Sequence, residues 1–233
     1  MTEQRNSPTP AKAPTKTEAH DPVARLSKAF IGTAGLIGVG KTTLANALGA
    51  HLGLDVYHEP LEDNVYLEDF YADTRRWSFA MQVYLLNRRF QQHQEIIWRG
   101  RGAVQDRTIY EDSIFARVLV DMDLMHPRDY ETYLELYRNL SNFMCRPTAI
   151  VYLHARPEAC HERIARRGRE FERVVSLAYL TRLYEAYEEF VENIARTIPV
   201  IRVDWENFGD VEALANAITH EVTRASYLRR VEL

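Results

Sequence analysis

The stretch GLIGVGKTTL, residues 35–44, decides the fold of this chain. It has the pattern G-x-x-x-x-G-K-[ST], whose fixed positions are Gly35, Gly40, Lys41 and Thr42. The short apolar segment 29–34 before it predicts a buried strand, and the segment after it has helical spacing up to Gly53. A strand, a loop and a helix in this order are the context in which the pattern forms a phosphate-binding loop.

The residue types of this loop suit the phosphates of a nucleoside triphosphate. Glycines let the backbone curl so that its N–H groups point at phosphate oxygens, and the start of the next helix favours negative charge. Lys41 can reach the β- and γ-phosphates, and the Thr42 hydroxyl can bind Mg²⁺. We therefore expect a phosphate site made by Gly35, Gly38, Val39, Gly40, Lys41, Thr42 and Thr43.

The composition divides the chain into a tail and one domain. Residues 1–27 are rich in Pro, Thr, Ala and charge and lack aromatic side chains, so they cannot bury enough apolar surface to offset the entropy of ordering. We expect this tail to be disordered, and it has no apolar segment typical of a secretory signal. The remaining residues, 28–233, carry one continuous α/β pattern and predict a single domain.

The totals argue against several classes of protein. The net charge is −4, which gives no general attraction for nucleic acid. No apolar run approaches the roughly 20 residues that span a membrane. The two cysteines, Cys145 and Cys160, lack the spacing of metal ligands and are typical of reduced thiols in a cytosolic protein. We expect a cytoplasmic protein that binds neither membrane nor nucleic acid.

Strand patterns alternate with helical ones, which predicts a P-loop α/β fold with a central parallel sheet of about five strands. The strand patterns cover residues 30–34, 55–58, 103–106, 148–153 and 200–203. The longest helical patterns cover residues 77–98, 128–144, 177–194 and about 210–227. The second and third of these helices carry tyrosine-rich stripes, which belong either to the core or to a dimer surface.

Charged residues follow the strands at the edge where open parallel sheets bind their ligands. Glu59, after the second strand, is placed to accept the proton of an acceptor hydroxyl; the alternative is a surface glutamate before a proline. Asp106, at the end of the third strand, either holds Mg²⁺ together with Thr42 or forms an ion pair with Arg107. Arg107 itself would clamp the oxygens of the transferred group.

A run of arginines follows the fourth strand, in RIARRGREFE, residues 163–172. Such a run is often a solvated helix face. Arginines without lysines instead favour planar, bidentate binding of phosphate, as in a lid that closes over a nucleotide. We expect this Arg-rich segment to be a lid.

Five motifs, taken together, resemble deoxyribonucleoside kinases, in particular the bacterial deoxyadenosine/deoxyguanosine kinase branch. They are GLIGVGKTT, HEPLEDNVYLEDFY, RWSFAMQVYLLNRRF, VQDRTIYEDSIFA and RIARRGREFE, which occur in the family's order between residue 29 and about residue 190. The resemblance implies ATP-dependent phosphorylation of the 5′-hydroxyl of a deoxynucleoside, with Mg²⁺, in nucleotide salvage. Many members of the family have Glu where this chain has Asp106.

The resemblance also implies roles around the sugar and the phosphates. Glu59 matches the general base, and Arg107 matches the arginine near the 5′-oxygen. Tyr71 and Glu172 match the pair that hydrogen-bonds the 3′-hydroxyl. The lid arginines that bind phosphate would be Arg163, Arg167 and Arg169.

The base pocket is implied by five further positions. Gln82 matches the side chain whose amide reads the base edge, Phe115 matches the stacking aromatic, and Trp77 would line the same pocket. Taken singly, these aromatics and Tyr71 are more often core residues. Arg89 lies seven residues after Gln82 on the same helix face, and Asp112 would complete a charged pair with it. Such a pair resembles members that accept purines or deoxycytidine, and we expect deoxyadenosine first, then deoxyguanosine or deoxycytidine.

Two other functions remain open at this point. A thymidylate-type nucleotide kinase also has Glu-Pro after its second strand, but the acidic Glu62 and Asp63 would repel a phosphorylated acceptor. A nucleotide-binding switch, or a silent partner subunit, does not require Glu59, Tyr71, Gln82 and Glu172 together. The family resemblance implies a dimer, either a homodimer or a heterodimer with a second kinase.

Overall fold

The computed structural model describes residues 26–59, 64–207 and 209–224. The predicted disordered tail therefore lies outside the described residues, apart from Leu26 and Ser27. These two belong to the folded part, since the Ser27 carbonyl accepts the N–H of Gly102 at 2.8 Å and Leu26 packs on the core.

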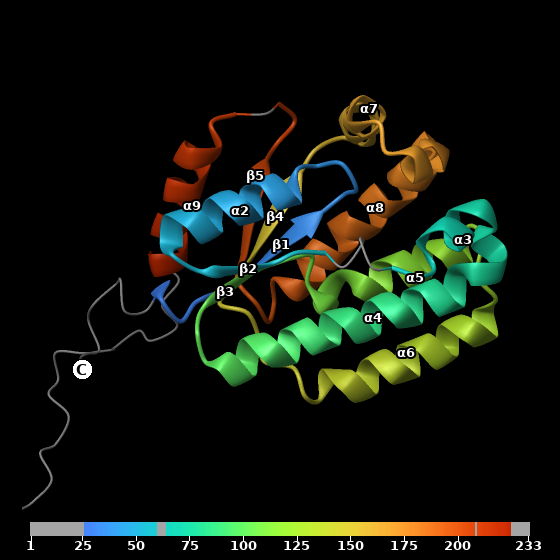
Figure 1. Ribbon diagram of the computed structural model, residues 1–233, viewed down its shortest axis with the longest axis horizontal. Coiled ribbons are helices and arrows are strands. Elements are labelled where there is room, and N and C mark those ends of the chain that lie inside the picture. The colour runs from blue at the N-terminus through green and yellow to red at the C-terminus, as the bar shows by residue number, and fades with distance from the viewer. Residues whose placement is uncertain (1–25, 60–63, 208, 225–233) are drawn as a thin grey trace, which may run out of the picture.

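Five parallel strands form one sheet in the order β2-β3-β1-β4-β5, as the sequence predicts (Figure 1). The strands are β1 Phe30–Gly35, β2 Asp55–Tyr57, β3 Ala103–Asp106, β4 Ala149–His154 and β5 Val200–Asp204. The first strand is thus central, between β3 and β4, with Thr33 in register with Asp106. This order brings the ends of β1, β2 and β3 together at one edge.

Helices cover both faces of the sheet, with α2 and α9 on one side and α4, α5, α6 and α8 on the other (Figure 1). Their bounds are α2 Lys41–Leu52, α3 Leu67–Ala72, α4 Thr74–Arg99, α5 Asp112–Asp121, α6 Pro127–Ser141, α7 Pro157–Arg167, α8 Leu177–Ile194 and α9 Val211–Arg224. Two 3₁₀ segments are η2 Ile109–Glu111 and η3 Glu170–Val174. Among the described helices, none combines the length and apolarity that crossing a bilayer requires.

Some predicted boundaries differ from the observed ones for local reasons. Helix α4 begins three residues before residue 77, because the Asp73 side chain accepts the Arg76 N–H at 3.1 Å and caps it. Strand β4 begins at Ala149, since the Thr148 hydroxyl oxygen accepts the Phe30 N–H at 3.1 Å. Strand β2 ends at Tyr57, one residue earlier than expected.

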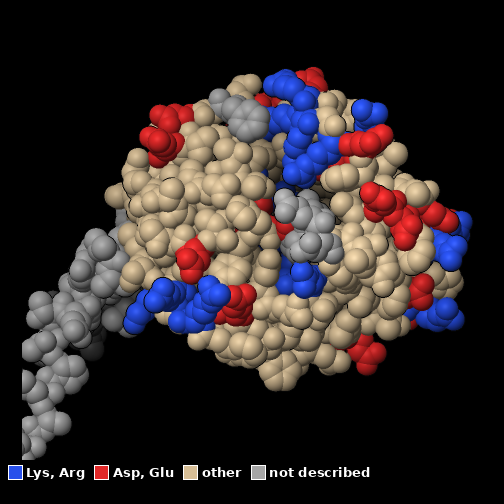
Figure 2. Space-filling model, viewed as in Figure 1, with Lys and Arg blue, Asp and Glu red and all other residues tan. Residues whose placement is uncertain are grey.

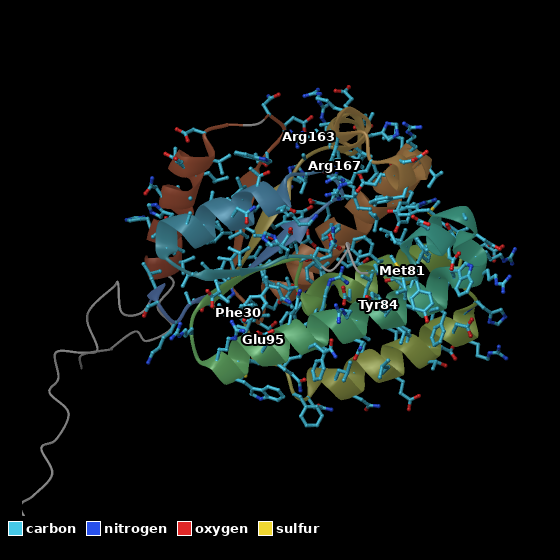
Figure 3. The ribbon with its side chains drawn as sticks, viewed as in Figure 1. Phe30, Met81, Tyr84, Glu95, Arg163 and Arg167 are labelled. Atoms are coloured by element: carbon cyan, nitrogen blue, oxygen red, sulfur yellow. The ribbon has the colours of Figure 1, made fainter. Side chains whose placement is uncertain are left out.

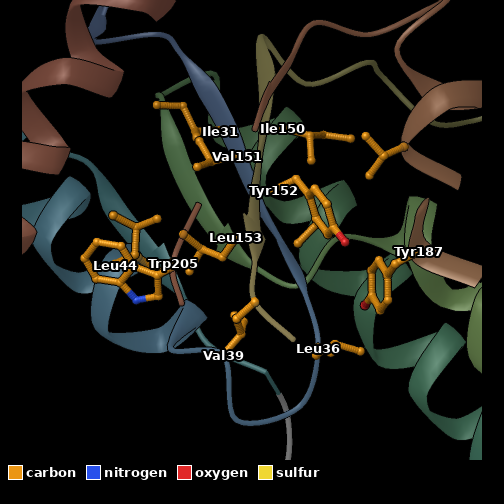
Figure 4. Packing of buried hydrophobic residues seen from close by; sticks show 14 of the residues in the cluster. Ile31, Leu36, Val39, Leu44, Ile150, Val151, Tyr152, Leu153, Tyr187 and Trp205 are labelled. Carbon is orange, nitrogen blue, oxygen red and sulfur yellow. The ribbon is translucent and has the colours of Figure 1, made fainter. Parts of the chain in front are cut away.

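The core lies on both faces of β1 and β4, as expected for a parallel sheet covered by helices. Figure 4 shows Tyr152 and Tyr187 on one side of these strands, with Leu44 and Trp205 on the other. The tyrosine stripes of α6 and α8 are core rather than surface at their centres, because Tyr133 and Tyr187 are fully buried.

Gly32 in β1 provides a test of this packing. A Cβ on Gly32 would lie 2.1 Å from the Cγ2 methyl of Thr108. We expect Gly32→Ala to lower the free energy of unfolding by about 1–3 kcal/mol through overpacking. Adding Thr108→Ser removes the opposing methyl and should restore most of the loss, as measured by urea denaturation. An equal loss in the single and double variants would contradict this packing.

Candidate active site

A cavity of about 880 Å³ opens at the carboxyl ends of β1, β2 and β3. Figure 2 shows a hollow in this face with basic side chains gathered on one rim. The structure brings most of the predicted residues to the cavity wall, from both the phosphate loop and the pocket. They are Gly38, Gly40, Lys41, Thr42, Thr43, Glu59, Tyr71, Gln82, Arg89, Asp106, Arg107, Phe115, Arg163, Arg167, Arg169 and Glu172.

The phosphate loop needs glycine for its backbone conformation. Gly35, Gly38 and Gly40 have φ values of 138°, 81° and 108°, in the region that side chains disfavour. Lys41 curls over the loop, and its Nζ donates to the carbonyls of Gly35 at 3.0 Å and Leu36 at 2.8 Å. Burial, assisted by the nearby charge of Arg107, lowers the pKa of Lys41 to about 8. Incoming phosphates would replace the carbonyls as its partners.

Thr42 and Asp106 lie together at the start of α2 and the end of β3. The Thr42 hydroxyl donates to the Asp106 carboxylate, whose other oxygen lies 3.4 Å from the Thr33 hydroxyl. The predicted alternative, an ion pair between Asp106 and Arg107, is wrong, because Arg107 pairs with Glu59 and Glu111 instead. The described residues contain no cluster of three or more His, Cys, Asp or Glu side chains suited to a metal ion.

Glu59 is the centre of the site. Its Oε1 lies 2.7 Å from Arg89 Nη2 and 2.9 Å from Arg107 Nε. Burial alone would raise the pKa of Glu59, but the charges of Arg107 and Arg89, with Lys41, bring it down to about 2. The side chain is therefore an ionised carboxylate at neutral pH, and it lines the cavity where it can accept a hydrogen bond from a hydroxyl. It is not the isolated surface glutamate of the alternative interpretation.

Glu172, one of the two predicted sugar-binding residues, is buried and forms ion pairs with two arginines. Arg167 donates to it through Nε at 3.0 Å and Nη2 at 2.6 Å, and Arg169 lies 3.5 Å away. Tyr71 stacks on the ring of Phe171, next to Glu172, with ring centroids 5.8 Å apart. The structure thus joins the predicted sugar pair to the predicted lid.

Arg163 and Arg167 of α7 form specific contacts with other parts of the chain, although Arg166 and Arg167 are exposed. Arg163 donates to the carbonyls of Val39, Trp205 and Glu206 at 3.3, 2.9 and 2.8 Å, and so ties α7 to the phosphate loop and to the end of β5. In Figure 3, Arg163 and Arg167 lie between α7 and the ends of the strands. Both line the cavity.

The far end of the cavity contains the predicted base-reading residues. Gln82 is buried and lines the wall, and Arg89 forms an ion pair with Asp112 through Nη1. Arg89 Nε and Asp112 Oδ2 are buried without a hydrogen-bond partner among the described residues. Arg107 lies over the ring of Phe115, 4.5 Å from its centroid. This end combines an aromatic wall with polar groups suited to a base.

Four predicted residues do not line the cavity in the described part of the chain. Gly35 and Val39 shape the loop through their backbone, and Asp112 lies behind Arg89. Trp77 contradicts the prediction of a pocket residue. Its ring lies 5.9 Å from that of Tyr66, and Arg76 covers it.

Two buried residues were missed by the sequence analysis, Glu111 and Tyr187. Tyr187 donates to Glu111, and Arg107 Nη1 donates to Tyr187 at 2.7 Å. Tyr187 belongs to a stripe that the sequence analysis gave either to the core or to a dimer surface, and Glu111 lies in a charged segment. The signal in the sequence was the tyrosine stripe of residues 177–194, in a chain whose strands are followed by charged residues.

A family model for deoxynucleoside kinases matches residues 31–226, which is most of the chain. The chain belongs to the deoxynucleoside kinase family. Members of this family use ATP as the phosphoryl donor, so ATP is the ligand expected at the phosphate loop. The assignment to this family confirms the resemblance found in the five motifs.

Curated relatives and solved structures agree with this assignment. The chain is 52% identical over 206 residues to a deoxyadenosine kinase of Dictyostelium discoideum, covering 88% of this chain and 84% of the relative. It is 36% identical to a deoxyadenosine/deoxycytidine kinase of Bacillus subtilis, covering 81% and 89%. A deoxyadenosine kinase structure from M. mycoides, with dCMP and dCDP bound, has a TM-score of 0.76 at 30% identity, covering 83% and 98%.

The depressed pKa of Lys41 predicts a pH dependence for this kinase. Above about pH 8 the lysine of the free enzyme loses its proton, so kcat/KM for ATP should fall with one ionisation. Lys41→Arg keeps its charge at that pH, so its lower kcat/KM should show no decline near pH 8. A decline at the same pH in both proteins, in initial rates from pH 6 to 10, would assign the ionisation to another group.

Proposed function

We propose that this protein transfers the γ-phosphoryl group of ATP to the 5′-hydroxyl of deoxyadenosine, for nucleotide salvage. The observation that carries the proposal is the position of Glu59. It is held by Arg89 and Arg107 between the phosphate loop and the pocket with Gln82. The deoxyadenosine kinase name of the relative at 52% identity supports the choice of base.

The residues divide the work of phosphoryl transfer. Lys41, with the arginines of α7, neutralises the charge of the phosphates, and Glu59 accepts the proton of the 5′-hydroxyl. Arg107 and Arg89 lower the pKa of Glu59 and keep its carboxylate ionised, so it can accept the proton as the hydroxyl oxygen bonds to phosphorus. Arg107 stabilises the oxygens between donor and acceptor.

The oxygens of Thr42 and Asp106 suit the Mg²⁺ that accompanies ATP. Mg²⁺ bound to a nucleotide takes one or two protein oxygens, and the remaining positions go to phosphate and water. The adjacent hydroxyl and carboxylate fit that donor set. When bound, the ion would neutralise charge on the β- and γ-phosphates.

The sugar and base pockets fit a deoxynucleoside. Tyr71 and Glu172 are proposed to bind the 3′-hydroxyl, and the amide of Gln82 with the Arg89–Asp112 pair is proposed to read the base edge. Arg89 lines the cavity and its buried Nε has no hydrogen-bond partner among the described residues, which supports a polar ligand here. We rank deoxycytidine and deoxyguanosine behind deoxyadenosine as acceptors, because relatives at 36% and 32% identity are named a deoxyadenosine/deoxycytidine kinase and a deoxyguanosine kinase.

The other two functions are less well supported. Glu62 and Asp63, which argued against a phosphorylated acceptor, lie outside the described residues. The family to which the chain belongs is, however, one of nucleoside kinases, which favours an acceptor without a phosphate. A nucleotide-binding switch needs no second pocket, so it does not explain the buried Gln82 and the Arg89–Asp112 ion pair.

The proposal predicts an order of substrates. With Mg·ATP, we expect deoxyadenosine to have the highest kcat/KM, measured beside deoxyguanosine, deoxycytidine, thymidine and their monophosphates. If deoxyguanosine or deoxycytidine had the highest kcat/KM, the proposed reaction would stand and the proposed base preference would be wrong. Turnover of monophosphates alone would reject a nucleoside kinase. As a control, Glu59→Gln should lower kcat by about 10²-fold or more while it retains ATP binding.

We also propose that two copies of the chain form a homodimer through α4 and α6. The tyrosine stripes no longer support this, but apolar side chains remain exposed on or just after these helices: Trp98 (78%) on α4, Leu136 (37%) on α6 and Phe143 (71%) two residues after α6. Exposed apolar groups of this size on two packed helices favour a protein surface as partner.

The dimer is tested by light scattering in solution. We expect a mass about twice the 27.1 kDa of one chain, and a monomer for Trp98→Glu. Val174→Glu, at an exposed apolar residue of η3, is the matched control and should leave the dimer intact. A monomeric wild-type protein would refute the proposal, and so would a dimer unaffected by the Trp98 change.

A further inference from the structure

We propose that Glu111 and Tyr187 are positioning residues that fix the guanidinium of Arg107 for phosphoryl transfer. Neither side chain is among the residues that line the cavity, and both contact Arg107 directly. The inference rests on the proposed function only for the reaction that Arg107 serves. The arrangement of the three side chains is a property of the fold.

Arg107 needs such support because its backbone is strained. Its φ is 68°, in the left-handed region that costs a non-glycine residue about 1–2 kcal/mol. The main-chain N–H donates to the Thr33 carbonyl at 3.1 Å, which continues the pairing of β3 with β1 by one residue. The chain then turns, and the side chain is directed toward Glu59. Strain of this kind persists where surrounding contacts hold it.

Glu111 supplies one of these contacts from η2. The side chain is fully buried, and a buried carboxylate is costly unless its oxygens are paired. Oε1 accepts the N–H of Thr108 at 3.0 Å, which fixes the turn after Arg107. Oε2 lies 3.3 Å from Arg107 Nη1 and also accepts the hydroxyl of Tyr187. Glu111 therefore links the backbone of the turn to the guanidinium that the turn presents.

Tyr187 supplies the second contact from α8, eighty residues away in sequence. Its hydroxyl accepts from Arg107 Nη1 at 2.7 Å and donates to Glu111. Its ring stacks on that of Tyr152, with centroids 5.9 Å apart and planes at 18° (Figure 4). It also makes an edge contact with the ring of Phe115. The hydroxyl of a ring held in this way has little freedom to move.

The two contacts determine which nitrogens of Arg107 remain for substrate. Nη1 is occupied by Glu111 and Tyr187, and Nε faces Glu59. Among the described residues, no group bonds to Nη2, and Arg107 lines the cavity. A guanidinium is a rigid fork, so fixing Nη1 fixes the direction of Nη2. Loss of either contact would let the fork rotate away from the reacting oxygens.

Tyrosine-to-phenylalanine changes at two stacked rings give a matched test. Tyr187→Phe should keep the stacking and lower kcat by about 10- to 100-fold, with KM for ATP within about twofold, because a misplaced group slows the reaction more than it weakens binding. Tyr152→Phe is the control. Its hydroxyl bonds to Glu188, outside the cavity, so kcat should remain near wild type. Glu111→Gln, which keeps the shape, should resemble Tyr187→Phe.

Equal kcat values for Tyr187→Phe and wild type would overturn the proposal. So would equal losses in Tyr187→Phe and Tyr152→Phe. The proposed function is tested separately, by whether the wild-type protein phosphorylates deoxyadenosine at all. The positioning role is tested by the ratios of variant to wild-type kcat. A crystal structure of Tyr187→Phe tests the positioning without any assay: we expect the Arg107 guanidinium to move from Glu59, and an unmoved guanidinium would refute the role.

Discussion

Two buried arginines that share one carboxylate are the constraint on which this site depends. Arg89 and Arg107 are each 2% exposed, and both form an ion pair with the same oxygen of Glu59. Two guanidinium groups this close repel each other and have lost their water, so they require negative partners on every side. Asp112 behind Arg89 and Glu111 behind Arg107 supply them. Removing one partner of such a pair typically costs about 3–5 kcal/mol.

The order of the strands makes this cluster possible. Parallel strands end at one edge, and the order β2-β3-β1 places the segments after these three strands side by side. Glu59 follows β2, Arg107 follows β3, and the phosphate loop follows β1. Helix α4 completes the cluster, because Gln82 and Arg89 are seven residues apart and so lie on one face. The cavity therefore presents the phosphate loop, Glu59 and Gln82 in a fixed order, which matches the proposed phosphate, hydroxyl and base sites.

The sequence predicted what depends on local pattern. The phosphate loop, the five strands and the helix pair of Gln82 and Arg89 all follow from short-range spacing. The same helical arithmetic explains the error at Trp77. Five residues before Gln82 place it about 140° around the helix, on another face. The ion pairs of Glu172, a proposed sugar ligand, with Arg167 and Arg169 were not foreseen, since they depend on how the segment after α7 folds back.

Long-range contacts account for the rest. The hydrogen bond between Arg107 and Tyr187 joins the residue after β3 to α8, and no spacing in the sequence indicates it. The left-handed backbone of Arg107 is likewise invisible, because it results from the pairing of β3 with β1 and the turn that follows. Such features are set by tertiary packing rather than by the propensity of any segment.

The central claim is that Glu59 faces the 5′-hydroxyl of a deoxynucleoside, whose 3′-hydroxyl is held by Glu172 and Tyr71. The most direct test is to identify the product of Mg·ATP and deoxyadenosine by proton-coupled ³¹P NMR. The account predicts a phosphorus signal split into a triplet by the two protons of the 5′-carbon. A doublet from the single proton of the 3′-carbon, or inorganic phosphate alone, would contradict it.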